Sequence, residues 1–440
     1  MRAILCLFLL LTVSCGNALA EETPAVSENY LKLAAEVESN LQQHVLLLWY
    51  PRALDKENGG FAQIFREDWS PGENTVKSIV YQSRLTWMAA NAALRYPERA
   101  AEFAAYTKHG LDFLHDRMWD REYGGFFWSV DQKGSPKLDR GGEKHVYGIS
   151  FGLYAACAAY KATKDERALD LAKRTFAWLE ENSHDNKHDG FIEALTRSGE
   201  PIVKVPTNGQ SSDMISTRYG FKSMNSHIHL LESYTALYEI WPDGKVKKRV
   251  KELLEVVRDK VAVEPGCLNL YFTLDWKPVP DHDSFGHDVE TAYLIVEAST
   301  ALGQPDDKAT WAMARMLVDH ALEFGWDNEN GGIYDKGSAF KGAHDTAKIW
   351  WVQAESLNAL LLMHEKFGAE TPKYWQAFLK QWSFIQKFQV DSKHRGWLNT
   401  VSKEGVAKPG RNKSDAWTEA YHQGRALLNV EAMLKKLAKH

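Results

Sequence analysis

A histidine and a glutamate one helical turn apart are the residues in this sequence whose types and spacing first suggest chemistry. His287 and Glu290 lie in the stretch DSFGHDVETAYLIVE, residues 283–297, and residues three apart share one face of a helix. Asp283 or Ser284 is predicted to cap this helix by accepting a free backbone N–H. We expect the carboxylate to orient the imidazole and to favour its charged form, which suits proton transfer near neutral pH. The alternative is a buried histidine satisfied by a neighbouring glutamate.

Six glycine-containing turns divide the chain into units of similar length. Each turn is followed by alternating apolar residues, as in GGFAQIF at 59–65 and GGFFWSV at 124–130. The marker glycines lie 64 to 76 residues apart, at Gly60, Gly125, Gly190, Gly266, Gly332 and Gly396. This regular spacing indicates a repeated supersecondary unit.

Each turn lies between two helix-like segments of different character. The segments before the turns are amphipathic, near 28–50, 98–119, 165–183, 245–261, 306–324 and 371–388. The segments after them are more apolar all round, near 79–96, 144–163, 222–240, 284–301, 347–367 and 414–437. The first pattern is typical of an outer helix with one solvated side, and the second of a buried helix. The series predicts an all-α fold, an (α/α)6 toroid (barrel) with short β-hairpins on one rim, formed by residues 21–440 as a single domain.

This geometry gathers the starts of all six inner helices on one rim, around the ring axis. Polar and aromatic residues are concentrated there: Arg84, Tyr147, Asn225, His229, His287, Glu290, Trp350, Trp351, Glu355, Trp417, His422 and Arg425. Buried polar groups that converge from separate units cost stability unless they are paired or used. We therefore interpret the rim as a functional pit rather than as ordinary core.

Two histidines on opposite sides of a small pit suit reversible proton transfer to and from carbon. His287 and His422 come from units four and six, so one could take a proton next to a carbonyl and the other return one to the opposite face. Arg84 could stabilise the enolate oxygen. Tryptophan rings suit the C–H faces of a sugar and would exclude water.

Other chemistries fit the sequence less well. His227, His229, His287 and His422 could bind zinc in principle, but the H-x-H spacing points the first two rings to different faces of a helix, so no metal is expected. Glu290 and Glu355 could flank a glycosidic bond, yet each has a histidine or tryptophan beside it. No nucleophile elbow and no phosphate-binding glycine loop is found.

Composition and the N-terminus describe an exported globular protein. The net charge of −5 and the absence of a basic stripe argue against nucleic acid. An apolar run precedes Ala18-Leu19-Ala20, so residues 1–20 are predicted to be a signal peptide, with a periplasmic protein beginning at Glu21. Lipidation at Cys15, which would anchor the protein to a membrane, is the alternative. Cys157 and Cys267 are expected to be unpaired.

Several segments resemble the N-acylglucosamine 2-epimerase superfamily, and most closely its cellobiose 2-epimerase and mannose isomerase branches. They are SFGHDVET, KIWWVQAES, MNSHIHLLESYTALYE, AWTEAYHQGRAL and the opening WYPRALDKENGGF. The resemblance covers nearly all of the mature chain. One departure is Thr418-Glu419-Ala420, where the family commonly has Lys-Cys-Pro.

The resemblance implies an (α/α)6 barrel that acts on free reducing sugars with no metal or other cofactor. It places the two catalytic histidines on His287 and His422, a substrate-polarising arginine on Arg84, and supporting residues on His229 and Glu290. Sugar contacts are expected from Tyr147, Asn225, Trp350, Trp351, Glu355 and Trp417.

Four functions remain open at this point: a sugar 2-epimerase on cellobiose- or mannobiose-like substrates, an aldose–ketose isomerase, an (α/α)6 glycoside hydrolase and a non-catalytic sugar-binding toroid. A shared fold does not choose between them.

Overall fold

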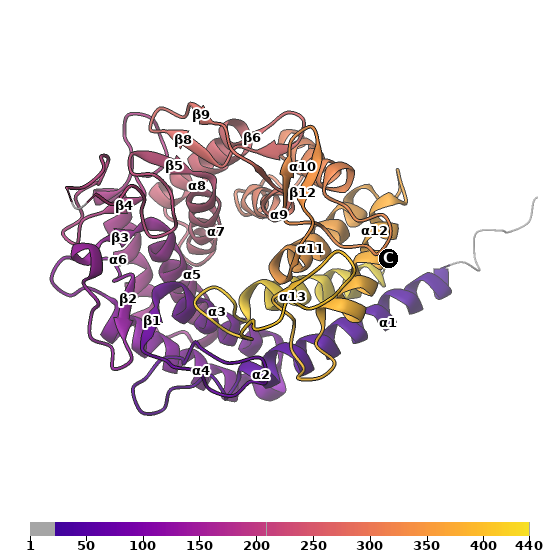
Figure 1. Ribbon diagram of the computed structural model, residues 1–440, viewed down its shortest axis with the longest axis horizontal. Coiled ribbons are helices and arrows are strands. Elements are labelled where there is room, and N and C mark those ends of the chain that lie inside the picture. The colour runs from indigo at the N-terminus through magenta and orange to yellow at the C-terminus, as the bar shows by residue number, and fades with distance from the viewer. Residues whose placement is uncertain (1–22, 208, 440) are drawn as a thin grey trace, which may run out of the picture.

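Two concentric sets of helices form a closed ring (Figure 1). This computed structural model describes residues 23–207 and 209–439. The outer helices are α1 (Thr23–Leu41), α4 (Ala100–Phe113), α6 (Glu166–Asn182), α8 (Gly244–Val256), α10 (Lys308–Phe324) and α12 (Lys373–Phe384). The inner helices are α3 (Ile79–Arg95), α5 (Val146–Thr163), α7 (Met224–Ile240), α9 (Phe285–Ala301), α11 (Trp350–Phe367) and α13 (Tyr421–Leu437). Each inner helix contacts the next, and α13 contacts α3, so the predicted (α/α)6 toroid is confirmed. We number the units one to six, each with an outer helix, a hairpin and an inner helix.

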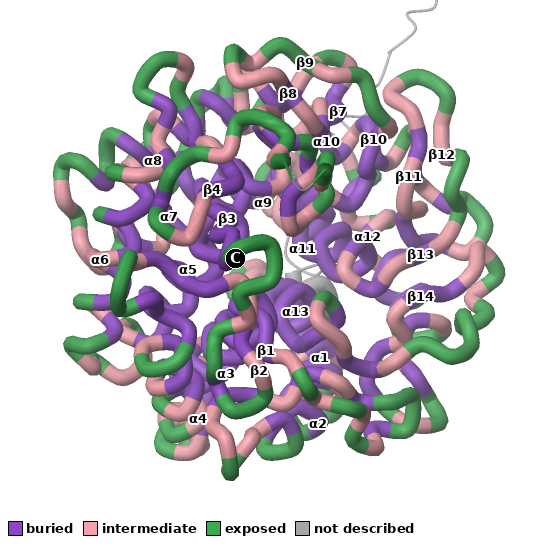
Figure 2. The backbone as a smooth tube through the Cα atoms, turned by 60° about the vertical axis from the view of Figure 1, so that its left-hand side comes forward, coloured by how far each residue is buried: buried purple, intermediate pink, exposed green. Residues whose placement is uncertain are grey.

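The two sets differ in burial as their sequences predict. Helix α6 buries one stripe, which includes Ala168, Leu171, Ala172 and Thr175 at helical spacing. Helix α5 is buried along nearly its whole length. Purple inner helices and green outer loops show this contrast in Figure 2. Shorter helical pieces complete the helical elements: η1 (Gln42–Leu46), α2 (Leu47–Trp49), η2 (Pro97–Arg99), η3 (Leu114–Met118), η4 (Asp139–Gly142), η5 (Val257–Val261) and η6 (Ile385–Gln389).

Short antiparallel strands on one rim join neighbouring units. The strand before an inner helix pairs with the hairpin of the next unit: β1 (Val76–Ser78) with β2 (Ser129–Asp131), β3 (Lys144–His145) with β4 (Ala194–Leu195), β5 (Phe221–Ser223) with β8 (Tyr271–Thr273), β10 (Asp283–Ser284) with β11 (Lys336–Ser338), and β13 (Lys348–Ile349) with β14 (Thr400–Val401). Strands β9 (Pro278–Val279) and β12 (Gly342–Asp345) extend two of these sheets, while β6 (Ala262–Val263) and β7 (Cys267–Leu268) pair within unit four. A bridge between Phe65 and Ser414 joins unit six back to unit one.

The marker glycines allow a turn that no other residue would fit. Gly60 has a φ of +64°, and a Cβ there would lie 2.5 Å from the side-chain oxygen of Gln82. In five units a lysine that precedes the inner helix bonds the turn aspartate, as Lys348 does with Asp327 at 2.7 Å. The lysine lies two residues before the helix in units one, two, three and five, and eight residues before it in unit six. The other pairs are Lys77–Asp55, Lys144–Asp120, Lys222–Asp185 and Lys413–Asp391. Unit four has Asp283 at the lysine position.

Some predicted boundaries were wrong. The last inner helix begins at Tyr421, not near residue 414, because Asp415 accepts the backbone N–H groups of Trp417 and Thr418, each at 2.9 Å, and holds a turn there. In units two to five, a short strand occupies the first residue or residues of the predicted helix.

Other predictions concern the cysteines and the N-terminus. Cys157 and Cys267 are buried and unpaired, as predicted. The predicted signal peptide and the alternative lipidation site at Cys15 lie outside the described residues. Within the described part of the chain, no helix combines the length and apolar character needed to cross a membrane.

Candidate active site

The N-terminal ends of the inner helices surround a cavity of about 450 Å³, which we call the pit. Its walls include ten of the side chains predicted from sequence: Arg84, Tyr147, Asn225, His229, His287, Glu290, Trp350, Trp351, Trp417 and His422. The helix-leading strands hold these helix starts in place, because each pairs with the hairpin of the next unit. The eleventh predicted residue, Glu355, lies behind His422 instead of in the wall.

His422 is oriented by a buried carboxylate. Its Nδ1–H donates to Oε1 of Glu355 at 2.7 Å, which leaves Nε2 to exchange protons. Burial, with the positive charge of Arg84, lowers the pKa of His422 well below its ordinary value of 6.5. His422 is therefore neutral near pH 7 and can accept a proton.

His287 is held differently from the sequence prediction. Its Nδ1 lies 2.7 Å from Oγ of Ser284, and this hydroxyl does not cap the helix. Burial lowers the pKa of His287 to about 4, although the Glu290 charge opposes the shift. The expected preference for the charged form is therefore wrong, because the cost of desolvation exceeds the attraction of one carboxylate.

Glu290 contacts a buried arginine rather than His287. Arg425 Nη2 donates to Oε1 of Glu290 at 2.6 Å and to Oε1 of Glu355 at 2.7 Å. Arg425 Nη1 bonds Glu232, so one guanidinium ties α13 to α7, α9 and α11. The expectation that Glu290 orients His287 is therefore not met: no hydrogen bond between the two is found among the described residues.

Arg425 lies beside a group of side chains whose spacing could hold a metal ion. Ligand atoms of Glu290, Glu355 and His422 lie within 4.8 Å of one another, a spacing that could hold a cation. The guanidinium of Arg425 already supplies a positive charge to both carboxylates. Burial alone would raise the pKa of Glu232, but Arg425 and His229 lower it to about 2. This cluster is thus an internally paired ionic network.

Arg84 is held at the wall by two partners. Its Nη1 donates to Glu419 Oε1 at 2.9 Å, and its Nη2 donates to Tyr147 Oη at 3.2 Å. The guanidinium also lies over the rings of Phe151 and Tyr421, 4.3 and 4.9 Å from their centroids. Glu419, in the segment that departs from the family pattern, thus partly neutralises the arginine.

Three buried polar atoms of wall residues have no hydrogen-bond partner in the described part of the chain. They are Nε of Arg84, Oδ1 of Asn225 and Nε1 of Trp350. Buried polar groups are normally paired, so unpaired atoms on three wall residues are unusual for ordinary core.

Aromatic rings complete the pit. Trp351 contacts both histidines: its ring centroid is 4.8 Å from that of His287 and 5.6 Å from that of His422. Trp417 is 43% exposed at the mouth, 6.1 Å from Tyr147. Flat apolar rings beside polar groups suit the faces of a pyranose.

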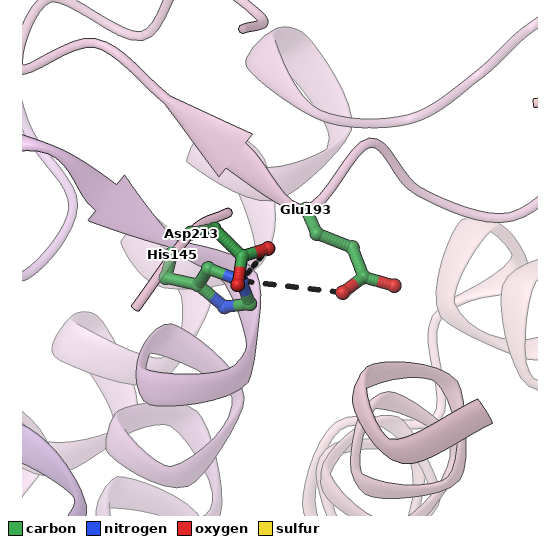
Figure 3. Close-up of side chains that lie close together, drawn as sticks. All are labelled: His145, Glu193 and Asp213. Atoms are coloured by element: carbon green, nitrogen blue, oxygen red, sulfur yellow. Dashed lines mark hydrogen bonds and ion pairs between the residues drawn. The ribbon is translucent and has the colours of Figure 1, made fainter. Parts of the chain in front are cut away.

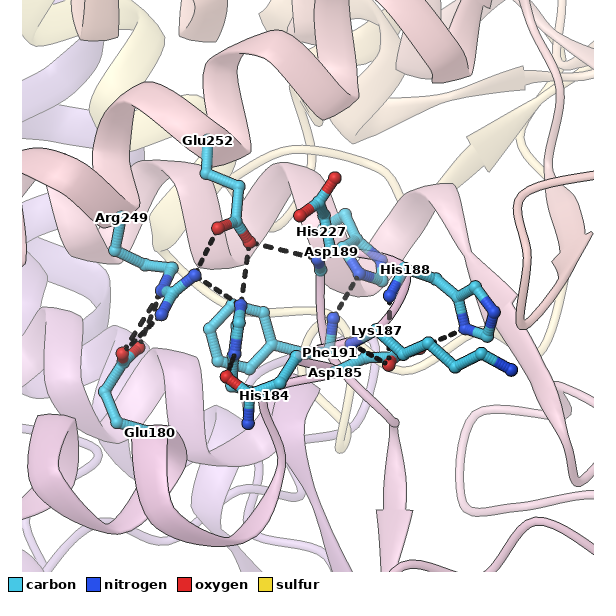
Figure 4. A network of polar contacts seen from close by, with 12 residues as sticks. Glu180, His184, Asp185, Lys187, His188, Asp189, Phe191, His227, Arg249 and Glu252 are labelled. Carbon is cyan, nitrogen blue, oxygen red and sulfur yellow. Dashed lines mark hydrogen bonds and ion pairs between the residues drawn. The ribbon is translucent and has the colours of Figure 1, made fainter.

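The H-x-H pair points in two directions, as predicted. His229 lines the pit, and its Nδ1 lies 3.1 Å from Oε2 of Glu232. His227 faces the outer layer, where its Nε2 accepts the N–H of Phe191 at 3.0 Å. Figure 4 shows His227 next to a network in which Arg249 bonds Glu180 and Glu252. His227 is therefore a structural residue of unit three.

Several pit residues were not predicted from the sequence. Met214, Ile215 and Ser216 line the pit from the loop between β4 and β5, and nothing in their types signals a site. Glu232, Glu419 and Arg425 are buried beside the wall residues. Arg425 was noted as polar at an inner-helix start, but its partners come from other units.

Comparisons with known proteins agree with this site. Residues 59–426 match the family model of N-acylglucosamine 2-epimerase. The cellobiose 2-epimerase of Bacteroides fragilis is 29% identical over 401 residues, covering 90% of this chain and 98% of that protein. The D-mannose isomerase of Marinomonas mediterranea is 25% identical over 410 residues, covering 89% and 96%. The structure of cellobiose 2-epimerase from Spirochaeta thermophila superposes with a TM-score of 0.82 at 28% identity, covering 95% of this chain and all of that one.

Fold, pit and relatives together define a carbohydrate epimerase or isomerase built on an (α/α)6 toroid. The chain belongs to the N-acylglucosamine 2-epimerase family, as its sequence motifs indicated.

Proposed function

We propose that the protein is a sugar 2-epimerase that inverts C2 at the reducing end of a cellobiose- or mannobiose-like sugar. The observation that carries this proposal is the placement of two neutral histidines, His287 and His422, in one pit, both in contact with the Trp351 ring. Epimerisation requires proton transfer at both faces of one carbon, which a single base cannot easily reach.

The pit residues and solvent supply the groups that this reaction uses. In the open-chain sugar, Nε2 of His422 takes the C2 proton, and the electron pair moves toward C1 to give a cis-enediolate. Arg84 stabilises the negative oxygen. Rotation about the C2–C3 bond turns the other face toward His287, which delivers a proton to C2. The pKa of His287, about 4, rises beside the enediolate charge, so His287 takes a proton from solvent and delivers it to C2. His422 releases the proton that it took from C2 to solvent, so no net proton is gained or lost. The roles exchange in the reverse direction.

An aldose–ketose isomerase is the second candidate, and the D-mannose isomerase relative favours it. It would return the proton to C1 instead of C2. A glycoside hydrolase is less well supported, because Glu290 and Glu355 both bond the same nitrogen of Arg425 and do not face each other across an open gap.

Product analysis by NMR in D2O tests the proposal. We expect cellobiose or mannobiose to give its C2 epimer with deuterium at C2. A new ketose would show an isomerase, and two free monosaccharides would show a hydrolase.

Substitution of each histidine tests the mechanism. His287→Ala and His422→Ala should each lower turnover by about 10²-fold or more, while sugar binding persists through Trp351 and Trp417. Each single variant keeps the histidine that deprotonates one of the two epimers. That variant should still exchange the C2 proton of that epimer with D2O. Turnover near the parent value in the double variant would contradict the mechanism.

A further inference from the structure

A short turn from outside the helical ring forms part of the pit wall. We call residues 213–217 the roof turn; its Met214, Ile215 and Ser216 line the pit. Asp213 at its start is only 4% exposed, whereas its neighbours Ser212, Met214 and Ile215 are partly exposed. A buried carboxylate needs a partner.

Asp213 both shapes and anchors the roof turn. Its Oδ1 accepts the backbone N–H groups of Ile215 at 3.0 Å and Thr217 at 2.9 Å. Its Oδ2 lies 2.9 Å from Nε2 of His145 (Figure 3). Ser216 has a φ of +71°, which L residues rarely adopt, so the turn depends on these bonds.

His145 connects the roof turn to the start of α5. Its Nδ1 accepts the N–H of Tyr147 at 3.1 Å, so the proton of a neutral ring is on Nε2, which donates to Asp213. The Tyr147 hydroxyl in turn accepts from Arg84 at 3.2 Å. Tyr147 therefore connects the turn to the arginine of the pit, with its backbone N–H bonded to His145 and its hydroxyl bonded to Arg84.

Glu193 extends the same cluster to α7. Its Oε2 lies 4.0 Å from Nε2 of His145 and accepts from the hydroxyls of Ser223 at 2.8 Å and Ser226 at 2.9 Å. Ser223 is the N-cap of α7, the helix that carries Asn225 and His229 into the pit. The position of the roof turn is thus set relative to two inner helices.

A series of contacts links the base of the roof turn to Trp417 through His145 and Trp128. The ring of Trp128 contacts both His145 and Trp417, with centroids 5.9 and 6.3 Å apart. The reacting end of a sugar must lie near His287 and His422. A second sugar ring attached to it therefore extends toward the mouth, past Trp417 and Ile215.

We propose that Asp213 is a positioning residue, which acts through His145 to hold the roof turn against the second ring of a disaccharide. This inference rests on the proposed function, and it assigns the 213–217 turn to the selection of two-ring over one-ring sugars. Asp213 touches no reacting atom, so its loss should weaken binding of the longer substrate rather than slow proton transfer.

Steady-state kinetics on two substrate lengths test this role. Asp213→Ala should raise KM for the disaccharide at least tenfold, with kcat changed less than about threefold and KM for glucose or mannose nearly unchanged. His145→Gln should act in the same direction. The double variant should be no worse than either single variant, because both act through one path. The inference would be overturned, with the proposed function left intact, if the parent were active and Asp213→Ala had the same kcat and KM as the parent on both sugars. It would also be overturned if Asp213→Ala lost activity equally on the disaccharide and the monosaccharide.

A matched control and a readout independent of activity accompany the kinetics. Asp131 accepts the N–H groups of Lys133 at 2.9 Å and Ser135 at 2.8 Å, the same turn pattern as Asp213. Asp131→Ala should leave both KM values unchanged. Trypsin should cut Asp213→Ala at the exposed Lys204 or Arg218 at least several-fold faster than it cuts the parent and Asp131→Ala. Unchanged cleavage would contradict the anchoring role even if the parent converted neither sugar.

Discussion

The two glutamates nearest the histidines have different roles from those that their sequence positions suggest. Glu290 is one turn from His287, yet its hydrogen bond goes to Arg425 at 2.6 Å. Glu355 is 67 residues from His422 and accepts its Nδ1–H at 2.7 Å. Glu290 lies 3.8 Å from the same nitrogen, too far for a hydrogen bond. The carboxylate that orients a histidine in this pit is therefore Glu355.

Glu355→Gln should lower kcat by about tenfold to a hundredfold, because an amide is a weaker acceptor for the His422 Nδ1–H and can also present its NH2 group. Glu290→Gln is the matched control, since both glutamates bond the same nitrogen of Arg425. Glu290→Gln should lower kcat clearly less than Glu355→Gln does. The measurements are kcat and the rate of C2–H exchange in D2O. Equal losses in the two variants would show that the charge around Arg425, not the orientation of His422, limits the rate.

At the scale of elements, unit four departs from the pattern of the others. Asp283 stands where five units have a lysine, and Asp288 on α9 faces it. Nδ1 of His320 on α10 lies 3.6 Å from Oδ2 of each carboxyl group. Burial, with the charge of Asp288, raises the pKa of Asp283 to about 8. The start of α9, which carries His287, therefore rests on an acidic cluster that keeps protons at neutral pH.

Asp283→Asn should make stability less dependent on pH. The folded-state pKa of Asp283, about 8, is above the ordinary value of 3.8. The folded state therefore binds the extra proton, and this contribution to stability is lost as pH rises toward 8. Between pH 6 and 9 the free energy of unfolding of the parent should fall by on the order of 2 kcal/mol more than that of the variant, because an asparagine at position 283 cannot ionise.

Thermal unfolding at both pH values measures this effect. Asp281→Asn changes an exposed residue two positions away, and its stability should depend on pH as strongly as that of the parent. If the stability of the parent and that of Asp283→Asn depended equally on pH, Asp283 would have to be ionised in the folded protein.

At the scale of the whole molecule, the ring is closed by contacts between its first and last units. Helix α1 packs against α13, and Oγ of Ser27 donates to the carbonyl of Ala438 at 2.7 Å. The bridge from Phe65 to Ser414 closes the rim. Each inner helix buries its sides against two neighbours, so removing one unit exposes apolar surface on two others.

Deletion of unit three, residues 165–241, should abolish cooperative unfolding, because the remaining five units cannot meet without changing every inter-helix angle. A circular permutant that joins residues 27 and 438 through a short linker and opens at Lys133–Gly134 should fold, since it retains all six units. Near-UV circular dichroism and denaturant unfolding distinguish the two. A five-unit protein with a single sharp transition would contradict the requirement for six units.

The sequence by itself determined the ring and the residues gathered at its centre. Glycine spacing and the alternation of amphipathic with apolar helices depend on local backbone preference and on burial, both of which a sequence displays. Topology then places Arg84, His287 and His422 on one rim, because all inner helices start there.

Only the tertiary structure decided the partners of these residues. The bonds of Glu355 with His422 and of Arg425 with Glu232 join residues that are 67 and 193 positions apart in the chain. They depend on side-chain rotamers across the packed ring. The low pKa of His287 depends on desolvation by the whole pit, which outweighs the one carboxylate visible in its helix. The residue types of the roof turn gave no sign that it lines the pit. Its position is set by the contact between Asp213 and His145, which are 68 residues apart and become neighbours only after folding.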